Sequence, residues 1–171
     1  MTIHTGKEWS FNNCHFFAIT DRKKSVIHQK GFLWVAQSED YITQEERIDH
    51  LATTFVGWCQ QWGVEKVYIE DYAFAARGKI FHIGENCGVL KHQLYKAGIS
   101  INVVSPPTIK KFATGKGNAQ KHGMGEAFLA ETHFDFHKLL NTENISNTSP
   151  TSDIIDSYYI CKYGHQASQK K

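Results

Sequence analysis

The sequence predicts an α/β domain in which a mixed β-sheet is covered by helices. Residues 2–4, 13–20 and 31–36 are rich in β-forming side chains and are separated by turns, which predicts short strands in the first forty residues. Further along, amphipathic helices alternate with apolar strands, the order typical of a sheet flanked by helices. The 171 residues suffice for one domain with its own core, which we place at 1–165, followed by a disordered basic tail at 166–171.

The middle of the chain carries the clearest helix and strand signals. Thr43-Gln44-Glu45-Glu46 fits a capping box, apolar residues follow at helical spacing, and Gly63 ends this first predicted helix. The apolar run 64–69 predicts a short buried strand that lies parallel to a later strand, and a second buried strand is predicted at 99–104. A loop containing Gly and Ala leads from the first of these strands into a predicted helix at 83–97.

Prolines and glycines divide the rest of the chain. Pro106 and Pro107 stop the second strand and are followed by a short helix. A flexible loop is predicted at 114–119, where Asn118 is a candidate cap for the next helix. A polar surface loop then precedes the last predicted helix, 152–164.

Composition narrows the class of protein. The net charge is only +2, so any surface that binds nucleic acid must be local. The four cysteines are widely separated and form no CxxC pair, which argues against a zinc site and against a disulfide framework. No apolar run approaches the roughly 18 residues of a membrane span, and no signal peptide is evident. We therefore expect a cytoplasmic protein with no membrane partner.

Three carboxylates form the candidate metal site. Asp153 and Asp156 are three residues apart in a predicted helix and so share one face, and Glu70 ends a predicted strand. Acids held side by side repel each other, which a divalent cation relieves. The alternatives are a solvated acid at a strand end, with Asp71 beside it, and first-turn acids favoured by the helix dipole.

A second group of residues suggests contacts with nucleic acid. Amines in a Gly-containing loop suit phosphate contacts, and exposed aromatic side chains beside a metal site suit stacking on unpaired bases. The candidates are Lys110, Lys111, Lys116 and Lys121, and after the strand acid Tyr72, Phe74 and Arg77. A solvated charge run and aromatics folded into the core are the alternatives.

Three segments together resemble the RuvC family of Holliday junction resolvases, in what looks like its bacteriophage branch. They are Val67–Glu70, Ser105–Lys121 with its Thr-Gly-Lys-Gly-Asn-Ala loop, and Ser152–Asp156, and the resemblance spans roughly residues 43 to 164. It implies a ribonuclease H-like fold and a homodimer that cuts four-way DNA junctions in recombination or replication.

The resemblance also implies roles for individual residues. Glu70, Asp153 and Asp156 would bind two Mg²⁺ ions, with Mn²⁺ able to substitute, and Lys110 and Lys121 would be the functional lysines. Tyr72 or Phe74 would help to open the junction. We further expect the predicted helix at 83–97 to supply the dimer surface; its candidate residues are Val89, Leu90 and Leu94.

The chain departs from the family at its beginning. The family's first strand carries a catalytic Asp, and nothing like it precedes the opening residues, which look like the fold's second strand, with residues 8–19 as the third. Three explanations are open: a start downstream of the true one, re-paired strands, or a first strand at 15–21 with Asp21 as the acid. Two alternative functions follow, a junction-binding protein without cleavage and a nuclease of the same fold that acts on other branched DNA or on RNA.

Overall fold

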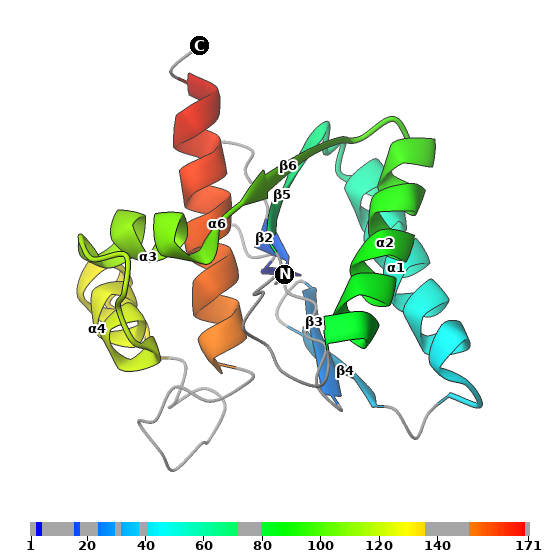
Figure 1. Ribbon diagram of the computed structural model, residues 1–171, viewed down its shortest axis with the longest axis horizontal. Coiled ribbons are helices and arrows are strands. Elements are labelled where there is room, and N and C mark those ends of the chain that lie inside the picture. Colours follow the sequence, from blue (N-terminus) through cyan, green and yellow to red (C-terminus); the bar gives the residue numbers. More distant parts are fainter. Residues whose placement is uncertain are drawn as a thin grey trace.

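The structure, a computed structural model, describes residues 3–4, 16–17, 24–29, 32–37, 41–71, 80–135 and 151–169. The elements of these segments, in chain order and as labelled in Figure 1, are β1 (Ile3–His4), β2 (Phe16–Phe17), β3 (Lys24–Gln29), β4 (Phe32–Gln37), α1 (Gln44–Gln61), β5 (Lys66–Glu70), α2 (Ile80–Lys96), β6 (Ser100–Val104), α3 (Pro106–Thr114), α4 (Lys121–Thr132) and α6 (Thr151–Gln169). The order of elements confirms an α/β fold.

The strands of the described segments pair two by two. β1 is antiparallel to β2, β3 is antiparallel to β4, and β5 is parallel to β6 with Glu70 opposite Val104. The parallel pairing of β5 with a later strand was predicted. β3 was not, because Lys24-Ser-Val-Ile-His-Gln29 holds only two adjacent apolar residues and gives no alternating pattern. Asp21, the candidate first acid, lies outside the described residues.

Helix α1 begins as its capping box predicts. The Thr43 side chain accepts a hydrogen bond from the Glu46 N–H at 3.1 Å, and the Glu46 carboxylate accepts one from the Ile42 N–H at 2.9 Å. Gly63 follows the helix with φ +63, a left-handed conformation that glycine adopts without strain. The sequence therefore fixes both ends of this helix locally.

Two hydrophobic cores lie on opposite faces of β5. Val67 and Ile69 point into a core built with α1 and α2, whereas Tyr68 packs against a second core built from α3, α4 and α6. Figure 1 shows this arrangement, with α1 and α2 together on one side of the β5–β6 pair and α6 on the other, followed by α3 and α4. By strand alternation, Glu70 belongs to the same face as Tyr68 and so faces the second core.

The predicted dimer residues of α2 need a correction. Leu90 and Leu94 are 6% and 0% exposed and pack in the core with α1, so they are wrong as a shared surface. The reason is the helical period, since positions four apart share one face and these two face inward. The opposite face of α2 exposes Phe81 and Tyr95, at 80% and 79%.

Helix α6 is longer than predicted. It runs from Thr151 to Gln169, past Gly164 and into the segment expected to be a disordered tail. Gly164 has another role, because a Cβ atom built on it would lie 2.3 Å from Cδ2 of Tyr68. A glycine here therefore allows α6 to approach the Tyr68 ring of β5 closely.

The segment 114–119 forms a compact turn between α3 and α4. Gly115 adopts φ +79 and closes α3, and the Cβ position of Gly117 lies 3.3 Å from the carbonyl oxygen of Pro107. The Thr114 hydroxyl accepts a hydrogen bond from the Lys116 N–H at 3.2 Å. Asn118 was the predicted cap of α4, but the N-cap is Gln120, which makes no side-chain hydrogen bond. The turn brings the chain back so that α4 packs against α3 and α6.

Three of the cysteines lie in the described segments, and they differ in their bonding state. Cys59 and Cys87 carry free thiols, and burial raises the pKa of Cys59 to about 12. Cys161 on α6 is disulfide-bonded, although the spacing of the cysteines argues against a disulfide framework. No helix in the described segments is long and apolar enough to cross a bilayer.

Candidate active site

The candidate site lies at the carboxyl end of the parallel strands. β5 ends at Glu70 and β6 at Val104, and the Asp71 N–H donates a hydrogen bond to the Val104 carbonyl at 2.8 Å, which holds the two strand ends together. This edge of a parallel sheet is where α/β proteins place their ligands. Glu70 faces α6 by strand alternation, so Glu70 and not Asp71 is the acid directed to the site.

Helix α6 brings its two acids to the same place. Asp153 and Asp156 lie on a helical face that also carries Gly164, which touches β5. Burial is the main reason that the pKa of Asp156 is raised to about 7, and the negative charges of Glu70 and Asp153 raise it further. The three predicted metal ligands therefore lie within electrostatic reach of one another.

The two predicted functional lysines belong to the same cluster. Burial and the charge of Asp153 raise the pKa of Glu70, while the ammonium groups of Lys110 and Lys121 act in the opposite direction. Lys121 also lowers the pKa of Asp156. The fold thus gathers all five residues predicted to be catalytic, from β5, α3, α4 and α6: Glu70, Lys110, Lys121, Asp153 and Asp156.

One residue at this site was missed by the sequence analysis. The hydroxyl of Ser152 accepts a hydrogen bond from Lys121 Nζ at 3.3 Å and donates one to Asp153 Oδ1 at 3.4 Å. Ser152 is only 4% exposed. Its position next to Asp153 was a signal, but a serine at a helix start is usually explained as a cap.

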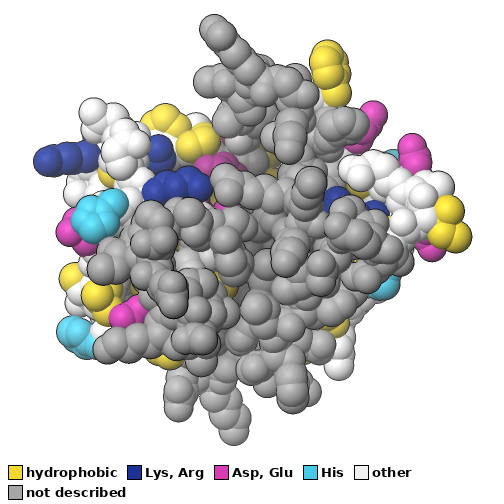
Figure 2. Space-filling view, turned by 90° about the horizontal axis from the view of Figure 1, so that it is seen from below, with side chains coloured by type: hydrophobic (Ala, Val, Ile, Leu, Met, Phe, Trp, Pro, Cys, Tyr) yellow, Lys and Arg dark blue, Asp and Glu magenta, His cyan; other side chains and the backbone are white. Residues whose placement is uncertain are grey.

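The other predicted DNA-binding residues are not part of this cluster. Lys111 and Lys116 are exposed on α3 and on the turn after it. Figure 2 shows Lys and Arg side chains gathered on the side of the molecule where α3 and α4 lie, next to acidic side chains. Tyr72, Phe74 and Arg77 lie outside the described residues.

The acids fit a divalent cation by chemistry, without forming a closed cage. Hard cations such as Mg²⁺ prefer carboxylate oxygens, and the repulsion that raises the pKa of Asp156 is what a cation would relieve. Among the described residues, no three His, Cys, Asp or Glu side chains lie close enough together to hold a metal ion by themselves. Site-bound cations of this kind usually keep several water ligands.

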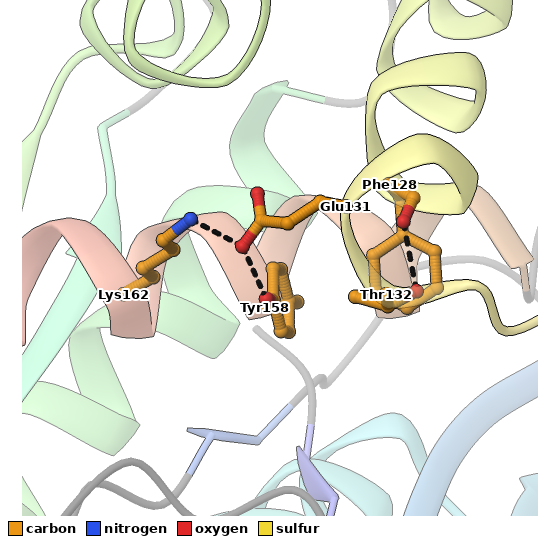
Figure 3. A network of polar contacts seen from close by, with 5 residues as sticks. All are labelled: Phe128, Glu131, Thr132, Tyr158 and Lys162. Carbon is orange, nitrogen blue, oxygen red and sulfur yellow. Dashed lines mark hydrogen bonds and ion pairs between the residues drawn. The ribbon is translucent and has the colours of Figure 1, made fainter.

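A polar network centred on Glu131 joins α4 to α6 (Figure 3), and it does not include Glu70, Asp153 or Asp156. The Glu131 carboxylate accepts a hydrogen bond from the Tyr158 hydroxyl at 2.7 Å and forms an ion pair with Lys162. Burial opposes ionisation of Glu131, but hydrogen bonds from Lys162 and Tyr158 hold its pKa below the ordinary value. The Lys162 amine also lies 5.8 Å from the centre of the Phe112 ring of α3. The network therefore joins the three helices that carry Lys110, Lys121 and the α6 acids.

Comparisons with known proteins give a consistent structural answer. No protein-family model and no curated protein sequence matches the chain. A structure of Thermus thermophilus RuvC matches with a TM-score of 0.57 and 16% identity, covering 85% of this chain and 88% of that one. T. thermophilus RuvC in complex with a Holliday junction substrate matches with a TM-score of 0.57 and 14% identity, covering 80% and 79%. The chain therefore has the ribonuclease H-like fold of RuvC, as its sequence motifs predict.

Proposed function

We propose that this protein is a Mg²⁺-dependent endonuclease that resolves four-way DNA junctions. The observation that carries the proposal is the convergence of Glu70, Asp153 and Asp156 with two lysine amines at the carboxyl end of β5. Carboxylates and amines in one place suit the cleavage of a phosphodiester, which needs a metal site and compensation of phosphate charge. The shared fold with a protein solved in complex with a Holliday junction supports the choice of substrate.

Each residue has a distinct role in this proposal. Glu70, Asp153 and Asp156 would hold two Mg²⁺ ions, which activate a water molecule and stabilise the leaving oxygen when bound. Lys121, on the same side as the α6 acids, stabilises negative charge that develops on the phosphate. Lys110 holds the phosphate. Exposed lysines of the turn region add contacts to the DNA backbone that do not depend on sequence.

The DNA-contact residues and the source of the protein rest on the sequence alone. Lys111 and Lys116 are the exposed lysines assigned to the backbone, and Tyr72, Phe74 and Arg77 remain predicted contacts to opened bases. A bacteriophage origin likewise stays a prediction of the sequence motifs.

The active form in this proposal is a homodimer. A four-way junction has two-fold symmetry and needs two symmetric cuts, which a second copy of the chain supplies. The outward face of α2 offers Phe81 and Tyr95 for this contact, since Leu90 and Leu94 are used by the core. Light scattering at micromolar concentration should give twice the 19.5 kDa of one chain. The Phe81→Ser and Tyr95→Ser double variant should give one chain mass.

The decisive experiment is nicking of a synthetic four-way junction. Cleavage should require Mg²⁺ or Mn²⁺ and stop in EDTA. Asp156→Asn should abolish cleavage and keep junction binding, because it removes a metal ligand and leaves the DNA-contacting amines in place. Asp49→Asn, an exposed change on α1, is the matched control and should cut at the wild-type rate. Cleavage that persists in EDTA would contradict the proposal.

A second candidate is a protein that binds junctions without cutting them. It is favoured by the absence, within the described segments, of three side chains close enough to hold a metal without rearrangement. Tight, salt-dependent junction binding with no nicking in either Mg²⁺ or Mn²⁺ would select this candidate. Equal cutting of four-way junctions, flaps and RNA hybrids would instead indicate a nuclease of broader specificity.

A further inference from the structure

The Ser152 hydroxyl group makes one of the contacts between α4 and α6 at the acid cluster. Ser152 is the second residue of α6 and is 4% exposed. Its Oγ accepts a hydrogen bond from Nζ of Lys121, the first residue of α4, at 3.3 Å, and donates one to Asp153 Oδ1 at 3.4 Å. The hydroxyl therefore touches one proposed catalytic amine and one proposed metal ligand.

A hydroxyl suits this place chemically. An ammonium group only donates hydrogen bonds and a carboxylate only accepts them, whereas a serine hydroxyl does both at once. The direction of the two hydrogen bonds, from Lys121 to Ser152 and from Ser152 to Asp153, is therefore fixed by the ammonium and carboxylate groups at their ends. Both distances exceed the usual ranges of about 2.7–3.2 Å for N–H···O and 2.5–3.0 Å for O–H···O bonds, so each contact is a weak one. The hydroxyl is buried, however, where such interactions are stronger than in water.

We propose that Ser152 is a positioning residue that sets where the Lys121 ammonium lies relative to the carboxylates of α6. Lys121 is exposed and its amine sits on a flexible four-carbon stem, so its own helix restricts the amine little. Ser152 ties that amine to the helix that carries Asp153 and Asp156. The proposal rests on the proposed function for its catalytic consequence, and on geometry alone for the contact.

The contact is tested first in the free protein, without metal or DNA. A double-mutant cycle of Ser152→Ala and Lys121→Met is followed by thermal unfolding. Ser152→Ala should lower Tm by about 2–4 °C in the wild-type background and by less than half as much beside Lys121→Met. Ser157→Ala is the matched control: Ser157 is 3% exposed on the same helix, and its hydroxyl donates to the Ile154 carbonyl at 2.9 Å. Its shift should be equal in both backgrounds.

The positioning role is tested by nicking of a four-way junction. Ser152→Ala should slow nicking about tenfold with junction affinity unchanged, and it should add nothing to the defect of Lys121→Met. Ser152→Thr, which keeps a hydroxyl, should recover most of the rate. A merely structural role would slow both backgrounds equally.

Three results would overturn the inference. Equal Tm shifts for Ser152→Ala in both backgrounds would remove the contact. Coupling in Tm together with wild-type nicking by Ser152→Ala would remove the positioning role. A wild-type protein that never nicks would refute the proposed function and with it the catalytic consequence, while the thermal cycle would still decide the contact.

Discussion

Replacing Gly164 by alanine tests how α6 is seated on β5. The added Cβ would lie 2.3 Å from Cδ2 and 2.6 Å from Cε2 and Cγ of Tyr68. Carbon atoms pack best at about 3.5–4.0 Å, so the helix and the ring must separate by roughly 1–1.5 Å. Cγ lies on the χ2 axis of Tyr68, so turning the ring about χ2 does not relieve the contact. Either the χ1 angle of Tyr68 must change or the backbone of α6 or β5 has to move.

Two opposing terms decide the effect on stability. Overpacking of a well-packed core costs about 1–3 kcal/mol, and a contact this short belongs at the upper end. Alanine in a helix gains about 1 kcal/mol over glycine. The net loss is about 2 kcal/mol, which lowers Tm by roughly 4–8 °C for a chain of this length.

The assay is thermal unfolding of Gly164→Ala beside a matched glycine. Gly57 lies in α1, is exposed, and has no atom within 4 Å of its Cβ position, so Gly57→Ala should raise Tm by about 2–4 °C. In a Tyr68→Ala background the clash is gone, and Gly164→Ala should then stabilise as Gly57→Ala does. A rise in Tm for Gly164→Ala in the wild-type background would refute the close contact.

Three further predictions concern charges. The pKa of Asp156 in the folded chain, about 7, lies above that of an aspartate in the unfolded chain. Between about pH 4 and 7 the folded chain therefore binds more protons than the unfolded chain. The free energy of unfolding consequently falls as the pH rises through that window. Asp156→Asn should therefore raise Tm at pH 8 and change it little at pH 4, and a larger gain at pH 4 would contradict this assignment. Lys121→Ala should slow junction nicking more than Lys110→Ala, and each variant should lower the salt slope of junction binding by about one. Wild-type nicking rates in both variants would show that these lysines are solvated surface charges with no role in cleavage. Glu131→Gln should lower the free energy of unfolding, measured with urea, by about 1–3 kcal/mol, because the partners of Glu131 are partly buried. Glu126→Gln is the control and should change it very little, because Glu126 forms an exposed pair with His122. Equal losses in the two variants would argue against the network.

Local sequence signals predicted the elements whose ends depend on their own residues. Thr43 and Glu46 cap α1 as expected, and the strand that ends at Glu70 pairs in parallel with the next strand. The acids could be predicted because strand alternation and helical spacing place Glu70 and the Asp153–Asp156 pair without further information. These are short-range rules that a single sequence carries.

The signals that failed depend on contacts distant in sequence. Gly164 looked like a helix end, but it is a glycine because the Tyr68 ring, nearly a hundred residues earlier, lies against it. Leu94 looked available for a partner and is covered by α1. Ser152 was predicted only as the first residue of the last helix, and its contact with Lys121 of α4 became evident from the structure. In each case the partner element decides the role, and periodicity alone does not identify that partner.

The order of the site residues along the chain has a consequence for synthesis. Glu70, Lys110 and Lys121 are translated before either acid of α6, and the buried residues of α6 make up much of the second core. A nascent chain that ends before residue 151 therefore has the amines and one acid but neither the acid pair nor the helix against which α3 and α4 pack. Domains fold as units during translation, so this half of the protein waits for α6 to leave the ribosome. Under the proposed function, a ribosome-bound chain that still lacks α6 has no nuclease activity, because two of the three acids of the site are not yet present.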